Sequence, residues 1–224
     1  VDAVAHAWAG PMSQVFGGLR AELGFPPSAR LVGIVTRLVP IKGVDVFLKA
    51  AVRAAEEVPE ARFVVVGDGE LRCELEDLAR QLGLGSRVRF LGFRRDTVRI
   101  CSALDLAVLS SHSEGLPVAL IEAIAAGCYV VATRVGGVSD LVVSERVGLT
   151  VEPGNSDALA DAVVRALAEN CVVPPEERKR AGTHFGIHRL EQDLDCLYRR
   201  LLQERGNRHI GGGMAASCRE GMRA

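Results

Sequence analysis

The chain has 224 residues, of which 48% are hydrophobic and 25% are charged. This length is near the upper end for one domain, and the composition is ordinary for a globular protein with a sizeable core. The formal net charge of −1 and the aromatic content of 4% argue against a generally basic nucleic-acid surface and against a platform for stacking bases. We therefore expect no nucleic-acid partner.

Cysteine spacing and hydropathy provide indications of the cellular compartment of the protein. No apolar run reaches the roughly 18 residues that a membrane-spanning helix needs. Residues 1–20 lack the basic start and apolar stretch of a signal peptide. The cysteines include no Cys-x-x-Cys pair, so we expect no zinc site and reduced thiols in a cytoplasmic protein, with peripheral contact to a membrane left open. The six cysteines are Cys73, Cys101, Cys128, Cys171, Cys196 and Cys218.

Short apolar runs alternate with amphipathic helical patterns along most of the chain. This alternation is typical of βαβ units and predicts a doubly wound, Rossmann-like α/β fold with a parallel sheet. A short helix is expected around residues 15–23. Strands are expected at residues 31–35, 63–66, 88–91, 104–109, 129–132 and 148–151. Further helices are expected at residues 44–57, 70–82, 95–102, 116–126, 156–170 and 187–204.

The two ends of the chain lack this pattern. Residues 1–29 show little periodicity, and we interpret them as a leading segment or the remnant of a linker. Residues 30–204 form the expected α/β domain. Residues 205–224 contain three consecutive glycines and little periodicity, so we expect a disordered tail there.

Four loops that follow predicted strands are rich in glycine or polar residues. They cover residues 36–43, 67–70, 110–117 and 133–139. In open parallel sheets, ligands bind at the carboxyl ends of the strands. The chemistry of this protein should therefore lie in these four loops.

The loop over residues 110–117 leads into a predicted helix. Gly115 allows close approach of the backbone to a ligand, and the free N–H groups of a helix start attract an anion. Glu122, further into the helix, suits a ribose diol because a carboxylate accepts two hydrogen bonds, and Glu114 would lie nearer a sugar. The alternative is that both are ordinary acids near a helix start, favoured by the helix dipole.

Two cations lie in the loop after the first predicted strand. They are Arg37 and Lys42, and together with Gly43 in the same loop they fit a diphosphate. The alternative is a solvated charged loop. Because this loop and the loop over residues 110–117 fall on the same rim of the sheet, the two together favour a ligand site.

At these residues the chain resembles the carboxyl-terminal, donor-binding domain of GT-B glycosyltransferases. The group concerned is the glycogen-synthase-like family 4 of retaining transferases. The most specific piece is a Glu-x7-Glu motif, Glu114 to Glu122, within SEGLPVALIEAIAAG. Supporting segments, in the family's order, are RLVPIKG (37–43), VVVGDGELR (64–72), VRFLGF (88–93) and VVATRVGGVSDLV (130–142). The resemblance covers about residues 22–203.

The resemblance implies a role for each matching residue. Arg37 and Lys42 would bind the donor diphosphate and stabilise the charge of the leaving nucleotide. Glu114 would contact hydroxyls of the donor sugar and hold the reacting centre, and Glu122 would bind the ribose. The other donor-binding residues implied are the backbone amides of Gly115, Leu116 and Val118, the side chain of Phe93 beside the base, and Gly67 and Asp68 along the cleft. His112, which lies inside the loop, is a further candidate for ligand contact.

The resemblance also implies an activity. Family members transfer a sugar with retention, generally without a metal, so we expect no cofactor and a UDP- or GDP-sugar as donor. The acceptor, whether glycan, lipid or small molecule, would be held by an amino-terminal lobe that residues 1–29 are too short to form. The helix at 187–204 would then keep part of its apolar face (Leu190, Leu194, Leu197 and Leu201) uncovered, unless it packs on this domain.

Two alternatives to a transferase remain open from the sequence. One is a non-catalytic module that binds a nucleotide sugar without turnover. The other is a sugar-nucleotide epimerase of the same fold, which would need further acids and a histidine from another lobe. The context of the Glu-x7-Glu motif favours the transferase over the epimerase.

Overall fold

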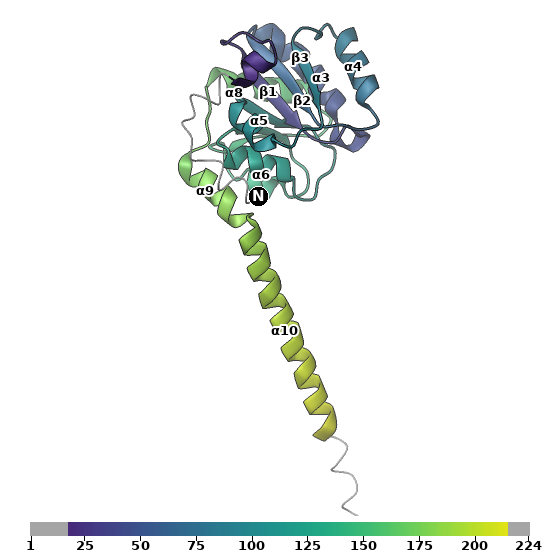
Figure 1. Cartoon of the computed structure of the whole chain (residues 1–224), viewed down its shortest axis with the longest axis vertical. Helices are drawn as coiled ribbons and strands as arrows, with labels where there is room; N and C mark the ends of the chain where they lie inside the picture. The colour runs from purple at the N-terminus through teal and green to yellow at the C-terminus, as the bar shows by residue number, and fades with distance from the viewer. Residues whose placement is uncertain (1–17, 215–224) are drawn as a thin grey trace, which may run out of the picture. The chain divides into compact units, whose positions relative to one another are not determined.

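Six parallel strands form one sheet in the order β3-β2-β1-β4-β5-β6 (Figure 1). The computed structural model describes residues 18–214, with side chains up to residue 203. The strands are β1 (Arg30–Val35), β2 (Ala61–Val66), β3 (Val88–Gly92), β4 (Leu106–Leu109), β5 (Tyr129–Thr133) and β6 (Gly148–Val151). This strand order is that of a doubly wound dinucleotide-type sheet, so the predicted fold class is confirmed.

Helices cover both faces of the sheet. Contacts place α3 against β2 and α8 against β4, β5 and β6, whereas α5 and α6 contact β1, β4 and β5. The helices and the short 3-10 helix η1 are η1 (Pro40–Lys42), α3 (Val44–Glu57), α4 (Arg72–Gln81), α5 (Thr97–Ala103), α6 (Val118–Ala125), α7 (Val138–Leu141), α8 (Ser156–Ala168), α9 (Pro175–His184) and α10 (Ile187–Met214).

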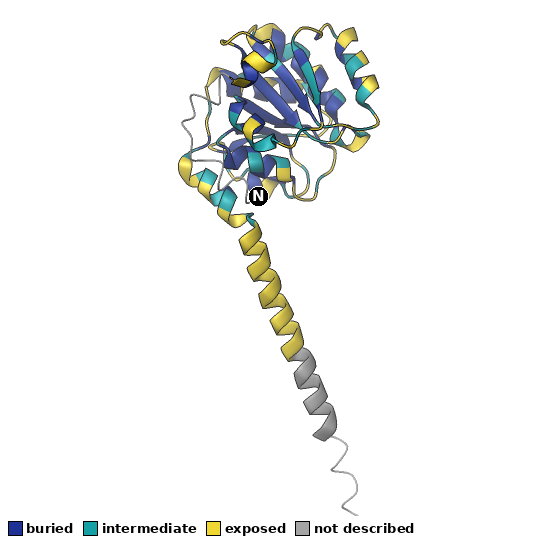
Figure 2. Cartoon of the chain, in the orientation of Figure 1, coloured by how far each residue is buried: buried dark blue, intermediate teal, exposed yellow. Residues whose placement is uncertain are grey.

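The core lies between the sheet and these helices (Figure 2). Alternate strand residues, such as Val32 and Ile34 of β1, join one large apolar cluster with α3 and α8. On the other face, Gly33 of β1 gives room to Leu104, because a Cβ at residue 33 would lie 2.5 Å from the Leu104 side chain. Both faces of the inner strands β2, β1, β4 and β5 are thus largely buried, which explains why their sequences are mostly apolar.

The point where the strand order reverses positions the candidate site. From β1 the sheet extends through β2 to β3 in one direction, and β4 lies on the other side of β1. Ligands of such sheets bind outside the carboxyl ends of the strands at this reversal. The loops after β1 and β4 therefore lie side by side, although their residues are about 70 positions apart in the sequence.

The structure departs from the predicted elements near the carboxyl end. Up to α8, the predicted elements match the observed ones to within two residues at each end, apart from the missed η1 and α7. Helix α9 was also not predicted, because Ala181 is its one buried residue and it has no apolar periodicity. Helix α10 was expected to end at residue 204 but runs to Met214; residues 205–214 lack the apolar pattern by which a helix is recognised.

By its contacts, the chain divides into two compact units between Thr183 and His184. The second unit contains α10, whose described side chains are exposed. The predicted apolar face of this helix, Leu190, Leu194, Leu197 and Leu201, is 39–57% exposed. The domain limits drawn from the sequence stay a prediction. The helix expected at 15–23 is seen as a helical turn over residues 18–22, and the rest of it and residues 1–17 lie outside the described residues.

The cysteines of the described residues are free. Burial is the main cause that raises the pKa of Cys101 to about 12, and it raises that of Cys128 well above the usual range. Both are therefore neutral, core-filling thiols. Cys218 lies outside the described residues. None of the helices in the described part of the chain has the length and apolar content to span a membrane.

Candidate functional site

The loops after β1 and β4 touch through their backbones. His112 N–H donates to the carbonyl of Ile41 at 2.8 Å, and the Ser110 hydroxyl donates to the carbonyl of Lys42 at 3.2 Å. Gly43 has φ 58°, and a Cβ there would lie 2.3 Å from the carbonyl oxygen of Ser110. A glycine is therefore required at residue 43, for its backbone conformation and for the close approach of the two loops.

This contact brings together two of the residues singled out in the sequence. Lys42, the last residue of η1, places Nζ 2.8 Å from both carboxylate oxygens of Glu114. The Ser111 hydroxyl donates to Oε1 of Glu114 at 2.6 Å. The side chains of Lys42 and Glu114 are 16% and 9% exposed, so the pair is largely shielded from water. The cation loop and the first glutamate of the motif thus form one cluster.

The second glutamate of the motif lies on α6 and contacts α5. Glu122 accepts a hydrogen bond at Oε2 from the hydroxyl of Thr97, at 3.0 Å. Cys101, one turn further along α5, is buried, and the charge of Glu122 is the second cause, after burial, that raises the pKa of this thiol. Glu122 therefore faces the side of α5 that carries Thr97 and Cys101.

The loop after β5 contacts the backbone of the loop that carries Glu114. Gly136, in the loop after β5, has φ 49°, and a Cβ there would lie 1.8 Å from the carbonyl oxygen of Glu114. Gly137 N–H donates to the carbonyl of Gly115 at 2.7 Å. The buried hydroxyl of Thr133 donates to the carbonyl of Ser111 at 2.6 Å. Three of the four predicted loops therefore meet around Glu114.

The fourth loop, after β2, packs against the loop after β1. Gly67 has φ 127°, and a Cβ there would lie 1.8 Å from the carbonyl oxygen of Thr36. The carbonyl of Asp68 accepts from Leu38 N–H at 2.9 Å, while its carboxylate accepts from Gly69 N–H at 2.8 Å and pairs with Arg72 at 3.3 Å. The carbonyl and the carboxylate of Asp68 are thus both engaged by neighbouring residues of the chain.

Other predicted residues lie at the surface and make no side-chain hydrogen bond or ion pair with the Lys42–Glu114 pair. Arg37 is exposed, and its side chain makes no polar contact within the described residues. Phe93, directly after β3, is 72% exposed, and His112 is exposed beside Gly43. At the start of α6, Leu116 and Val118 are about half exposed; the helix begins at Val118, with Pro117 as its N-cap.

Sequence reasoning missed Thr97, Ser111 and Thr133. Ser111 stands three residues before Glu114 in a loop already singled out, and that spacing was the available cue. Thr133 follows directly on a predicted strand. Nothing in the local sequence connects Thr97 with Glu122, which lies 25 positions later on a different helix.

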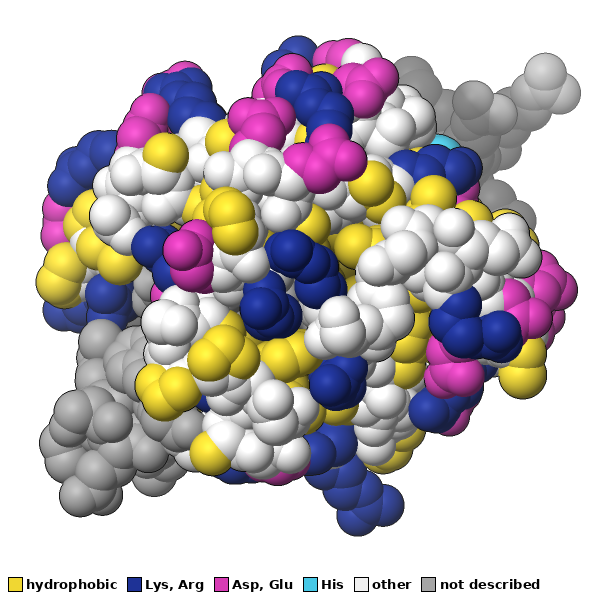
Figure 3. Space-filling model, turned by 90° about the horizontal axis from the view of Figure 1, so that it is seen from above, with side chains coloured by type: hydrophobic (Ala, Val, Ile, Leu, Met, Phe, Trp, Pro, Cys, Tyr) yellow, Lys and Arg dark blue, Asp and Glu magenta, His cyan; other side chains and the backbone are white. Residues whose placement is uncertain are grey.

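Two of the cavities in the described part of the chain lie at opposite ends of the strands. One, of about 630 Å³, adjoins η1 and α4; it is lined mostly by apolar side chains and by His112 at its edge. Another, of about 350 Å³, lies at the amino ends of the strands, beside Arg30 and Asp105. Figure 3 shows one face of the molecule, on which Lys and Arg side chains lie among acidic, hydrophobic and uncharged ones.

Comparison with known proteins identifies the family to which the chain belongs. The family model described as "Glycosyl transferases group 1" matches residues 17–184. The D-inositol 3-phosphate glycosyltransferase of Corynebacterium urealyticum is 34% identical over 208 residues, which are 86% of this chain and 49% of that protein. The chain thus spans about half the length of this relative.

Solved structures show the same fold. HepE of Anabaena, crystallised with UDP and glucose, superposes with a TM-score of 0.76 and 27% identity over 84% of this chain and 52% of that one. The carboxyl-terminal domain of a group 1 glycosyltransferase, LpcC of Francisella tularensis, superposes with a TM-score of 0.61 and 28% identity over 75% of this chain and 91% of that domain. The chain therefore belongs to the group 1 glycosyltransferases and corresponds to their carboxyl-terminal GT-B domain.

Proposed function

We propose that this chain is the donor-binding half of a retaining glycosyltransferase that moves a hexose from a UDP- or GDP-sugar to an acceptor. The observation that carries the proposal is the Lys42–Glu114 contact. It joins the cationic loop after β1 to the Glu-x7-Glu loop after β4, at the reversal of the sheet. Support comes from HepE, which was crystallised with UDP, with UDP-glucose, and with UDP and glucose.

The donor diphosphate is assigned to Lys42 and Arg37. An ammonium group has three N–H donors, and the two oxygens of Glu114 engage two of them, which leaves one for a phosphate oxygen. The exposed Arg37 guanidinium supplies a further fork of donors that matches phosphate geometry. As the bond to the sugar breaks, these cations stabilise the negative charge that develops on the leaving nucleotide.

The remaining roles follow the positions of the other residues. Glu114, held by Lys42 and Ser111, contacts hydroxyls of the donor sugar. Glu122 binds the ribose, and the exposed ring of Phe93 lies beside the base. The free N–H groups at the start of α6 face the phosphates. The acceptor is held by a second lobe, and transfer proceeds with retention and without a metal.

Titration calorimetry with UDP and GDP tests this assignment. Wild-type protein is expected to bind at least one of them, and Glu122→Ala and Lys42→Ala are each expected to weaken binding at least tenfold, because each removes a charged hydrogen-bonding partner. Lys179→Ala removes an exposed lysine of α9 and is the matched control, with unchanged affinity. A folded wild-type protein that binds neither nucleotide would falsify the assignment.

A further inference from the structure

Glu122 is held by a neighbouring helix rather than by its own. Its Oε2 accepts the hydrogen bond from Thr97, the first residue of α5. A carboxylate has two oxygens, and within the described residues Oε1 receives no hydrogen bond from a side chain or backbone N–H. Thr97 therefore occupies one oxygen of Glu122 and leaves the other for a ligand.

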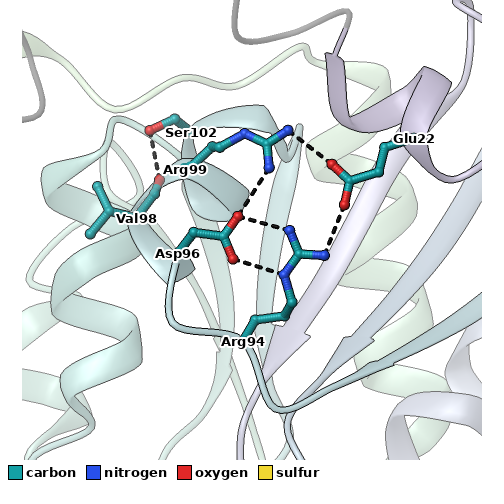
Figure 4. A network of polar contacts seen from close by, with 6 residues as sticks. All are labelled: Glu22, Arg94, Asp96, Val98, Arg99 and Ser102. Carbon is teal, nitrogen blue, oxygen red and sulfur yellow. Dashed lines mark hydrogen bonds and ion pairs between the residues drawn. The ribbon is translucent and has the colours of Figure 1, made fainter.

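The start of α5 is fixed by a network of charged side chains (Figure 4). Arg94 donates to both carboxylate oxygens of Asp96 at 2.8 Å and to Glu22 at 2.8 Å. Arg99 donates to Asp96 at 3.0 Å and to Glu22 at 2.9 Å. Asp96 is the residue that precedes Thr97, and a bidentate arginine–carboxylate pair has a well-defined geometry. The network thus fixes the backbone that carries the Thr97 hydroxyl.

The other end of α5 is tied to the same part of the chain. Arg20 is buried and donates to the carbonyl of Ala103, the last residue of α5, at 3.3 Å, and to the carboxylate of Asp105. Arg20 and Glu22 belong to one helical turn over residues 18–22. One short segment before β1 therefore holds both ends of the helix that orients Glu122.

We propose that Thr97 is a positioning residue for ribose recognition, which it serves by fixing the carboxylate of Glu122 on a helix anchored by Arg20 and Glu22. The proposal rests on the proposed function, in which Glu122 binds the ribose. Without the Thr97 hydroxyl, the Glu122 side chain gains rotamers, and ordering it again upon binding costs affinity. Thr97 itself need not touch the nucleotide.

The test is a set of variants of the full chain titrated with UDP, or with GDP if that is the nucleotide that the wild type binds. Thr97→Val is expected to weaken binding about fivefold or more, the effect of losing one hydrogen bond. Thr97→Ser keeps the hydroxyl and is expected to restore affinity to within about twofold of wild type. In a Glu122→Ala background, Thr97→Val is expected to cause no further loss, because the residue through which it acts is gone.

Ser102→Ala is the matched control on the same helix, because its hydroxyl donates to the carbonyl of Val98 and not to Glu122. Unchanged affinity in Thr97→Val, failure of Thr97→Ser to restore binding, or a further loss in the Glu122→Ala background would each overturn the positioning role and leave the proposed function standing. A folded wild type that binds neither nucleotide would overturn both.

Discussion

Lys42 and Glu114 form an ion pair that is largely buried. Taking both charges out of water is costly, and the pair offsets this cost only while both partners are present. Removing one partner leaves the other buried without its counter-charge. The two residues assigned to the donor therefore also contribute to the stability of the loops that carry them.

Lys42→Met is expected to lower the free energy of unfolding by about 3 kcal/mol, because Glu114 is left as an uncompensated charge. Glu114→Gln is expected to be destabilising for the converse reason. The double variant should lose clearly less than the sum of the single losses. Urea unfolding of the four proteins measures the coupling. Additive losses would show that the pair does not act as a unit.

Some residues of this site can be identified from the sequence alone, and others cannot. Glu114, Glu122 and Lys42 stand in a recognisable motif or at a strand end, so they are identifiable without coordinates. Thr97 acquires its role only because α5 and α6 pack together, and the sequence carries no local sign of that contact. The sequence pattern does not reveal contacts between side chains of separate helices and strands.

At the scale of elements, the short helix α5 depends on its charged anchors. Hydrogen bonds from Arg94, and then from Arg99, lower the pKa of Asp96, and those from the same arginines lower the pKa of Glu22. A carboxyl whose pKa is lower in the folded protein adds stability at neutral pH. That stability is lost as pH falls below about 4, the range in which such a carboxyl titrates in the unfolded chain.

Asp96→Asn is accordingly expected to lower the Tm near pH 7 and to differ less from wild type as pH falls below about 4. Thermal unfolding at a series of pH values measures this difference. Asp140→Asn, at an exposed aspartate of α7, serves as the control. A Tm difference between Asp96→Asn and wild type that is the same at pH 3 and pH 7 would contradict a charge-based anchor.

The strands were easier to predict from the sequence than helix α9, because they bury more apolar residues. The four inner strands are buried on both faces and are therefore largely apolar, so they stand out in the sequence. The edge strands β3 and β6 are partly exposed but keep apolar residues. Helix α9 buries a single residue and lacks that signal. Its available cues were Pro175 at the first position and two acids in the first turn, a combination that suits a helix start.

At the scale of the molecule, the proposed function places the donor residues on one half of a two-lobed site. The chain covers about half of the relative from Corynebacterium urealyticum. We expect these 224 residues alone to bind nucleotide but to transfer no sugar, because an acceptor must be held against the donor for reaction. Incubation with UDP-glucose and detection of released UDP tests this. Sustained turnover by the isolated chain would contradict the two-lobe interpretation.

The contact between the loops after β1 and β4 has a thermodynamic consequence. Lys42 and Glu114 are 72 positions apart, so their pairing exists only when the intervening strands and helices are in place. In the unfolded chain this pairing is absent, and a nucleotide that binds the folded chain alone would shift the folding equilibrium by mass action. At a ligand concentration of about 100 times Kd, this linkage adds about 2.7 kcal/mol to the stability of the whole domain. The supply of donor would then affect the folded fraction of the protein as well as its occupancy.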